Sequence, residues 1–129
     1  MRSATTLTLA LGLLGPALAA QSVPRNADGK LDLAVLVTGR EDGTRRSAFA
    51  TFLEQHFARV GVCDYTAFAP ADADDFDVVV FDCEIRPAPG RIGLAKAPTL
   101  PPDFARASML VAGGGAILAD PLGLKTDWG

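Results

Sequence analysis

The clearest hydrophobic pattern in the chain predicts a strand followed by a helix. Residues Leu33–Val37 form an unbroken apolar run that ends at Thr38 and Gly39, and such a run is typical of a parallel strand covered on both faces. Apolar character resumes at Ala48 and recurs at helical spacing, so we expect a helix over Thr44–Val60. Its expected apolar stripe consists of Phe49, Phe52, Leu53, Phe57 and Val60.

Three further strands are expected along the chain. Gly61 is expected to end the helix, and Val62–Tyr65 then forms a short second strand. Asp77–Asp82 is the most β-prone window and predicts a central strand. Met109–Ala112 predicts a fourth, and Gly113–Gly115 after it permits positive φ and close backbone approach. This alternation predicts an α/β fold with a mostly parallel open sheet, its strands in the order 2-1-3-4.

One periodic helix is too little to cover both faces of such a sheet. Residues 85–102 contain five prolines and two glycines, which predicts an irregular loop there, either functional or mobile. Either the domain is unusually thin or it is incomplete at its carboxyl end. We expect an uncovered apolar face at Met109–Ala112 or beyond, and a native chain that continues past Gly129.

The first twenty residues have the pattern of a signal peptide. Arg2 supplies one positive charge before an apolar segment, residues 4–14, that is too short to span a bilayer. Gly15 and Pro16 break this segment before small residues that suit cleavage. We expect a signal peptide at 1–20, a flexible lead-in at 21–30 and the α/β domain at 31–129, in an exported protein that is periplasmic or extracellular. The alternative is a buried amino-terminal helix of the mature fold.

Charge and cysteine positions restrict the partners. The chain carries 12 Lys and Arg against 15 Asp and Glu, a formal net charge of −3, and loss of Arg2 with the leader makes it one unit more negative. This charge disfavours nucleic acid, and no stable membrane insertion is expected after cleavage.

Cys63 is expected at the start of the second strand and Cys83 at the end of the third, on opposite edges about 15 Å apart. A disulfide needs Cα atoms within about 7 Å, so we expect free thiols or partners outside the chain.

The order of these pieces resembles the class I glutamine-amidotransferase-like superfamily and, within it, the ThuA-like (trehalose-utilisation) proteins. The resemblance covers residues 31–129 and implies the amino-terminal part of a longer flavodoxin-like domain. Amidotransferases of the superfamily carry a cysteine nucleophile in a Gly-x-Cys-x-Gly elbow with a downstream His and Glu. Cys83 has no flanking glycine and the only histidine, His56, precedes it, so no triad is carried over and no reaction is implied. The resemblance rests on Val35–Gly39, on Phe52, Leu53 and Phe57, on Asp77–Asp82, and on Gly113–Gly115.

The loop after the first strand is the first candidate binding site. In open α/β sheets ligands bind at the carboxyl ends of the strands, where Thr38, Gly39 and Arg40 are expected. Thr44 can cap the helix that follows, and its amino terminus together with Arg45 and the neighbouring arginines can hold an anion. The loop lacks G-x-G-x-x-G and the P-loop lysine. The alternative is a solvated turn with surface arginines.

Two carboxylates end the third strand at the same edge. Alternation sends Asp82 and Glu84 to one face, where they can do acid–base work, bind a divalent metal or hydrogen-bond sugar hydroxyls. Two ligands are too few for a metal site, and no metal or cofactor is expected. Gly113 and Gly114 complete the candidate set. The alternative is a solvated strand end.

Two hypotheses of function follow. The first is an exported ThuA-like domain that binds a carbohydrate or another small polar ligand at this edge, with or without hydrolysis. The second is a non-catalytic structural or interaction module that retains the fold. His56, at the border of the expected helical stripe, is expected to be a partly buried packing residue. Cys83 is a poor nucleophile candidate because Asp82 and Glu84 flank it.

Overall fold

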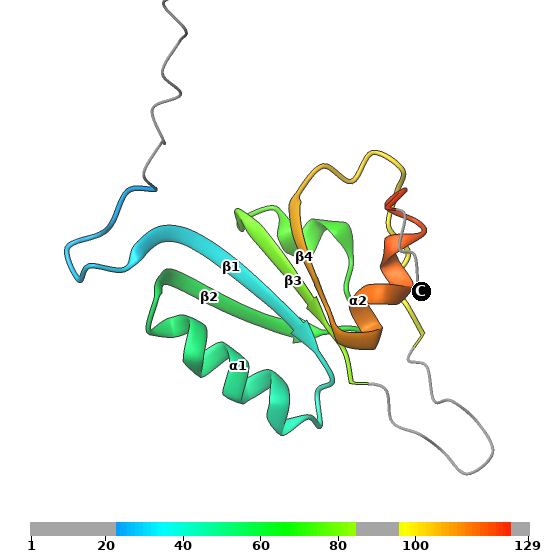
Figure 1. The fold of residues 1–129 in the computed structure, drawn as a ribbon, viewed down its shortest axis with the longest axis horizontal. Helices are drawn as coiled ribbons and strands as arrows, with labels where there is room; N and C mark the ends of the chain where they lie inside the picture. Colours follow the sequence, from blue (N-terminus) through cyan, green and yellow to red (C-terminus); the bar gives the residue numbers. More distant parts are fainter. Residues whose placement is uncertain (1–22, 85–95, 125–129) are drawn as a thin grey trace, which may run out of the picture.

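The computed structural model describes residues 23–84 and 96–124, and it has an α/β flavodoxin-like fold (Figure 1). Four parallel strands form one sheet in the order β2-β1-β3-β4, as predicted. The expected leader, most of the proline-rich connection and residues 125–129 lie outside the described residues. No helix in the described part of the chain is long and apolar enough to cross a membrane. The elements are β1 (Leu31–Gly39), α1 (Thr44–Glu54), β2 (Phe57–Asp64), the 3₁₀ helix η1 (Pro70–Ala73), β3 (Val78–Asp82), β4 (Ala107–Val111) and α2 (Ala112–Ala119).

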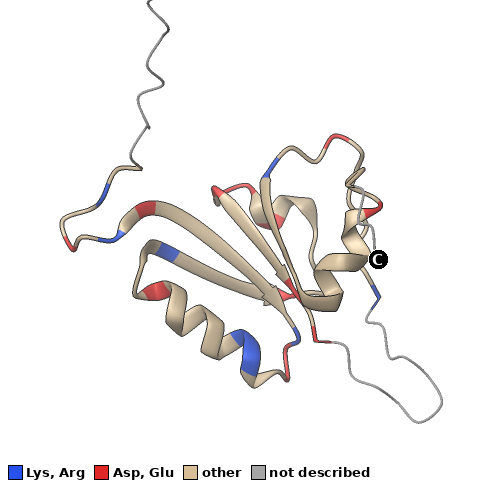
Figure 2. Ribbon diagram, viewed as in Figure 1, with Lys and Arg blue, Asp and Glu red and all other residues tan. Residues whose placement is uncertain are grey.

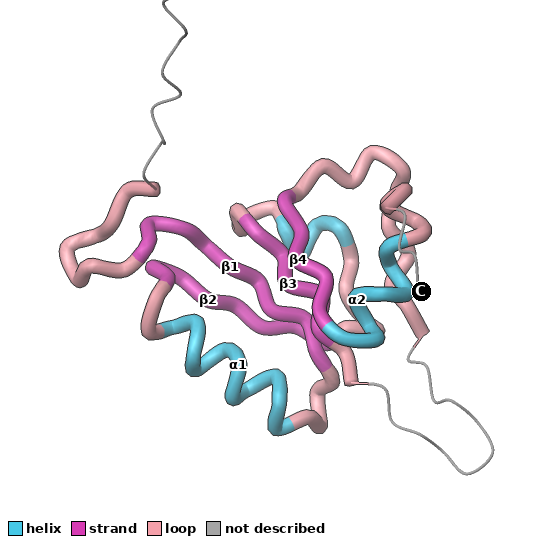
Figure 3. The backbone as a smooth tube through the Cα atoms, in the orientation of Figure 1, coloured by secondary structure: helices cyan, strands magenta, loops and turns pink. Residues whose placement is uncertain are grey.

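The sheet separates two apolar clusters, because successive side chains of a strand point to opposite faces. On one face, Val37 and Val80 pack with Leu53 of α1. On the other, Leu36 and Phe81 pack with residues of η1, α2 and the segment before β4. Helix α1 contacts β1 and β2, whereas α2 contacts β3 and β4 (Figure 3). On the face of the sheet that α1 covers, the helix therefore lies over β1 and β2, and the carboxyl ends of β3 and β4 lie beside it.

Helix α1 is shorter than the sequence pattern predicts. It ends at Glu54, and Phe57–Val60, expected in the helix, begins β2 instead. Phe57 pairs with Leu31 and Val60 with Val35, so main-chain pairing to β1 takes the place of helical hydrogen bonds. The expected apolar stripe is therefore right only in part. Phe49 and Leu53 of α1 pack on the sheet, whereas Phe52 is 53% exposed.

Two residues near the end of α1 also differ from expectation. His56 is exposed in the turn between α1 and β2, not partly buried at the border of a helical stripe. Gly61 lies inside β2 and does not end a helix. A Cβ atom at Gly61 would lie 2.4 Å from Cζ of Phe76, so the missing side chain makes room for that ring.

The triple glycine lies in the first turn of α2 and adopts no positive φ. The left-handed residue at this strand-to-helix corner is Ala112, with φ 54. Close backbone approach, the other expectation, is confirmed: a Cβ at Gly114 would lie 2.4 Å from Cβ of Cys83, and one at Gly115 would lie 2.6 Å from the carbonyl carbon of Leu110. The glycines allow α2 to pack directly on β3 and β4. On the opposite face of β4, Met109 is 54% exposed, as expected for an uncovered strand.

The two cysteines are free, but for a different reason from the one given by the sequence. Cys63 lies near the carboxyl end of β2, on the same sheet edge as Cys83, so their expected separation across the sheet is wrong. Strand β1 lies between their two strands. Two strand spacings amount to about 10 Å, which exceeds the reach of a disulfide.

Candidate functional site

The loop between β1 and α1 is anchored at the carboxyl edge of the sheet by Asp64. The backbone N–H of Glu41 donates to Asp64 Oδ2 at 2.9 Å, and that of Thr66 donates to Asp64 Oδ1 at 2.8 Å. The hydroxyl hydrogen bond from Thr66, followed by backbone N–H donors, lowers the pKa of Asp64. The sequence reasoning missed Asp64, although an Asp at the end of a strand is a common turn-forming residue.

Asp82 is the buried charged residue of this edge. It is 3% exposed, and its Oδ2 accepts a hydrogen bond of 2.7 Å from Arg45 Nε. Its Oδ1 has no hydrogen-bond partner among the described residues. Arg45 comes from the first turn of α1, which is basic (Figure 2), and its side chain is 47% exposed. The hydrogen bond and charge of Asp82, and then the charge of Glu84, raise the pKa of Arg45.

The Arg45–Asp82 pair lines a cavity of about 370 Å³ between α1 and the carboxyl ends of β3 and β4. Its other lining residues are apolar: Ala48 and Phe49 from α1, and Val111 at the end of β4. We call this cavity the α1 cleft. It combines apolar walls with a buried carboxylate, the usual composition of a small-molecule site.

Thr38 is not part of the α1 cleft. It pairs with Phe81 across the β1–β3 ladder, so its side chain lies on the face opposite to Asp82. Thr38 is fully buried, and its Oγ1 has no partner in the described part of the chain. The structure therefore separates two residues that the sequence reasoning grouped in one site.

The β1–α1 loop residues serve the structure of the loop. Gly39 packs against the start of α1, where an added Cβ would lie 2.9 Å from Cβ of Arg46. Arg40 forms a surface pair with Asp42, with Nε and Oδ1 at 3.2 Å. Thr44 is exposed and is the first residue of α1 rather than its cap, because Gly43 occupies the N-cap position.

The glycines of α2 lie close to the carboxyl edge without lining the cleft. Gly114 donates its N–H to the carbonyl of Cys83 at 3.1 Å. The carbonyl of Gly114 accepts a hydrogen bond of 2.6 Å from the buried Tyr65 hydroxyl. Gly113 is half-buried in the first turn of the helix. Gly114 thus joins α2 to the residues that directly follow β2 and β3, and it is a structural residue.

Neither cysteine has the environment of an activated thiol. Burial raises the pKa of Cys83, and neighbouring carboxylates add to this effect. Burial also raises the pKa of Cys63 to about 11. His56 lies before the amino end of β2, at the opposite edge of the sheet from Cys83. The two therefore form no nucleophile–base pair.

No family model, curated protein or solved structure matches the chain. The chemistry of the α1 cleft has to be inferred from its own residues. Within residues 23–84 and 96–124, no group of three or more His, Cys, Asp or Glu is placed to hold a metal ion.

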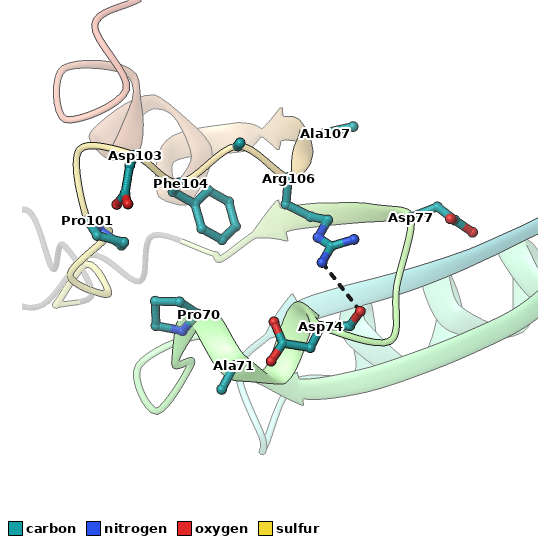
Figure 4. Close-up of a pocket in the computed structure, with 10 residues that line it drawn as sticks. Pro70, Ala71, Asp74, Asp77, Pro101, Asp103, Phe104, Arg106 and Ala107 are labelled. Carbon is teal, nitrogen blue, oxygen red and sulfur yellow. Dashed lines mark hydrogen bonds between the residues drawn. The ribbon is translucent and has the colours of Figure 1, made fainter.

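A larger cavity, of about 600 Å³, lies at the amino edge of the sheet (Figure 4). Its lining includes Asp74, Asp77, Asp103, Phe104 and Arg106. All four charged residues are exposed, and Asp77 Oδ2 already accepts the backbone N–H of residue 34 at 2.7 Å. Ligands of open α/β sheets bind at the carboxyl edge, so the smaller α1 cleft is the stronger candidate despite its size.

Proposed function

We propose that this chain is an exported ThuA-like domain that binds a small polar ligand, such as a carbohydrate, in the α1 cleft. The observation that carries the proposal is the buried carboxylate of Asp82, which lines a cavity at the carboxyl edge with one oxygen unpartnered among the described residues. Leaving a buried acceptor unsatisfied costs about 1–3 kcal/mol. Oδ1 is itself buried, so a ligand recovers that cost where a side chain of the cleft moves and lets a donor reach this oxygen.

The size and shape of the cleft support the same proposal. At about 370 Å³ it lies at the small end of ligand pockets, which range over roughly 300–1,000 Å³. Arg45 lines it with a guanidinium group that has N–H donors in addition to Nε. Phe49 offers an aromatic ring on which an apolar ligand face can pack.

Thermal melting against a panel of monosaccharides, disaccharides, small anions and small amines tests this proposal. A ligand at 100 times its dissociation constant raises the free energy of unfolding by about 2.7 kcal/mol, which gives a clear shift in Tm. A stabilising ligand should lose its effect in Asp82→Ala but keep it in Asp75→Ala, since Asp75 is an exposed acidic residue in the connection before β3. Absence of any shift across the panel contradicts the proposal.

The second candidate is a non-catalytic interaction module, favoured by exposed apolar side chains on α1 and on the two edge strands β2 and β4. Phe52 is 53% exposed, Val62 51% and Met109 54%. Sedimentation velocity of the wild type and of Met109→Lys tests this candidate. Self-association that Met109→Lys abolishes supports it. A monomer at every concentration, combined with a ligand-induced Tm shift, favours the binding function instead.

A further inference from the structure

Strand β4 forms one edge of the sheet and lacks the features that usually protect such an edge. It pairs with β3 on one side, and no strand among the described residues pairs with its other side (Figure 1). Edge strands are commonly protected from pairing with another chain by charged residues, prolines or bulges. Ala107–Val111 contains no charged residue and no proline, and its pairing with β3 continues without a register shift. The outer edge of β4 is therefore a surface on which another strand can pair.

The opposite edge strand, β2, differs from β4 in the features that oppose pairing. It carries Arg59 and Asp64, and its ladder with β1 is irregular between Leu31 and Ala34. Like charges that lie opposite one another destabilise a pair of strands, and an irregular ladder increases the local twist. Of the two edges, β4 is therefore the one that favours the addition of a strand.

The residues of β4 suit a second copy of the same strand. In an antiparallel pair centred on Met109, this residue lies opposite Met109 of the second copy, and Ala107 lies opposite Val111. Because side chains alternate along a strand, these residues all lie on one face, which is the face where Met109 is 54% exposed. The small Ala107 leaves room for Val111 of the second copy, and the two methionines cover each other. Pairing thus buries apolar surface and also satisfies the strand edge.

The charge of Arg106 selects the antiparallel arrangement. Arg106 directly precedes β4, so a parallel pair without stagger would place two arginines about 5 Å apart on neighbouring strands. In the antiparallel pair centred on Met109, Arg106 lies opposite residue 112 of the second copy. The two arginines are then six residues apart along the strands, which is about 20 Å. This distance exceeds the Debye length of about 8 Å at physiological ionic strength, so repulsion between them is screened.

We propose that β4 pairs in antiparallel order with β4 of a second copy of this chain, which gives a homodimer with one continuous sheet. The paired segment of five residues spans only about 17 Å, so the interface is smaller than the roughly 800 Å² per partner of a standard one. The dimer is therefore weak and forms at roughly 100 µM and above. This inference goes beyond ligand binding in the α1 cleft and gives the second candidate function, an interaction module, a defined partner.

Disulfide trapping tests the geometry of the pair. Directly opposite residues of an antiparallel pair have Cα atoms about 4.5–5.5 Å apart, a separation that a disulfide can bridge. Met109→Cys should therefore form a disulfide-linked dimer when the full chain is oxidised by air at high concentration. Val62→Cys is the matched control, because Val62 lies on the other edge strand and is 51% exposed against 54% for Met109. Non-reducing electrophoresis should show the dimer of Met109→Cys forming at least about tenfold faster.

Sedimentation velocity tests the association without an added cysteine. The average sedimentation coefficient of the wild type should rise with concentration over the range from about 10 µM to 1 mM that suits a weak interface. Met109→Lys places two ammonium groups opposite each other and should remain a monomer. Val62→Lys adds the same charge to the other edge and should dimerise as the wild type does. Circular dichroism and Tm show whether both lysine variants are folded.

Three outcomes overturn the inference. The first is a wild type that is monomeric at every concentration. The second is equal rates of disulfide formation in Met109→Cys and Val62→Cys. The third is a dimer that Val62→Lys abolishes and Met109→Lys leaves intact, which would place the interface on β2 and leave the second candidate function standing. If Met109→Lys fails to fold, the difference between the two cysteine variants decides the result.

Discussion

Replacing Arg45 by Met tests whether Asp82 is a desolvated carboxylate that depends on its partner. The variant keeps much of the aliphatic stem but removes the Nε that donates to Asp82 Oδ2 at 2.7 Å. Asp82 is 3% exposed, and its Oδ1 has no partner in the described part of the chain. In Arg45→Met neither oxygen would retain a hydrogen bond from a described residue in the present geometry, so the carboxylate would lose its charged partner while it stays buried.

The magnitude follows from the burial of the two partners. Removing one member of a fully buried ion pair costs about 3–5 kcal/mol. The side chain of Arg45 is 47% exposed, so solvent screening reduces its contribution. The loss of a charged partner by a buried acceptor costs about 1–3 kcal/mol, and we expect a destabilisation in that range. In an Asp82→Asn background the same replacement should cost less, because no buried charge is left behind.

Urea denaturation followed by circular dichroism, with linear extrapolation to water, measures these differences in the free energy of unfolding. Arg40→Met is the matched control, because Arg40 uses its Nε in an exposed pair with Asp42 at 3.2 Å. Such a surface pair contributes about 0–1 kcal/mol. If Arg45→Met and Arg40→Met cost the same, or if Asp82→Asn does not reduce the effect, the description of Asp82 as a desolvated, Arg-dependent carboxylate is wrong.

Four further predictions address the rest of the fold. The folded-state pKa of Asp64 is lowered, so Asp64 contributes stability above its unfolded pKa near 4 and loses it as the pH falls through the folded value. The Tm difference between wild type and Asp64→Asn should therefore be largest at neutral pH and shrink in acid; a pH-independent difference would contradict this. Gly114→Ala places a Cβ 2.4 Å from Cβ of Cys83 and should cost about 1–3 kcal/mol in urea denaturation; an unchanged midpoint would refute that contact. Cys63, with its pKa raised to about 11, and the buried Cys83 should react with a thiol reagent at neutral pH much more slowly in the native protein than in urea, and equal rates would show that these thiols are accessible. Phe52→Asp should change the free energy of unfolding by only about 0.5 kcal/mol, since Phe52 is 53% exposed. A loss of several kcal/mol would show that Phe52 is buried, as the sequence pattern suggests.

Local sequence was sufficient to predict that four strands form the sheet and in which order they lie, although the first half of β2 was expected in a helix. Leu33–Val37 and the valines of β3 are unbroken apolar runs, and such runs are stable only where both faces of a strand are covered. This placed β1 in the interior of the sheet, and the structure confirms that β1 lies between β2 and β3. It also located the carboxyl edge and Asp82, because the end of a strand can be recognised from its own residues.

Tertiary structure alone decided which secondary structure the ambiguous segments adopt and which side chains meet. Phe57 and Val60 fit both a helical stripe and a strand, and pairing with β1, which depends on residues far away in sequence, makes them a strand. The Gly113–Gly115 run resembles a turn in isolation but forms a helix, because α2 packs on the backbone at Cys83 and Leu110. Likewise, only strand register puts Thr38 and Asp82 on opposite faces, and only the docking of α1 turns Arg45 onto Asp82. Periodicity records where a residue can be buried, whereas non-local hydrogen bonds and packing determine what it is buried against.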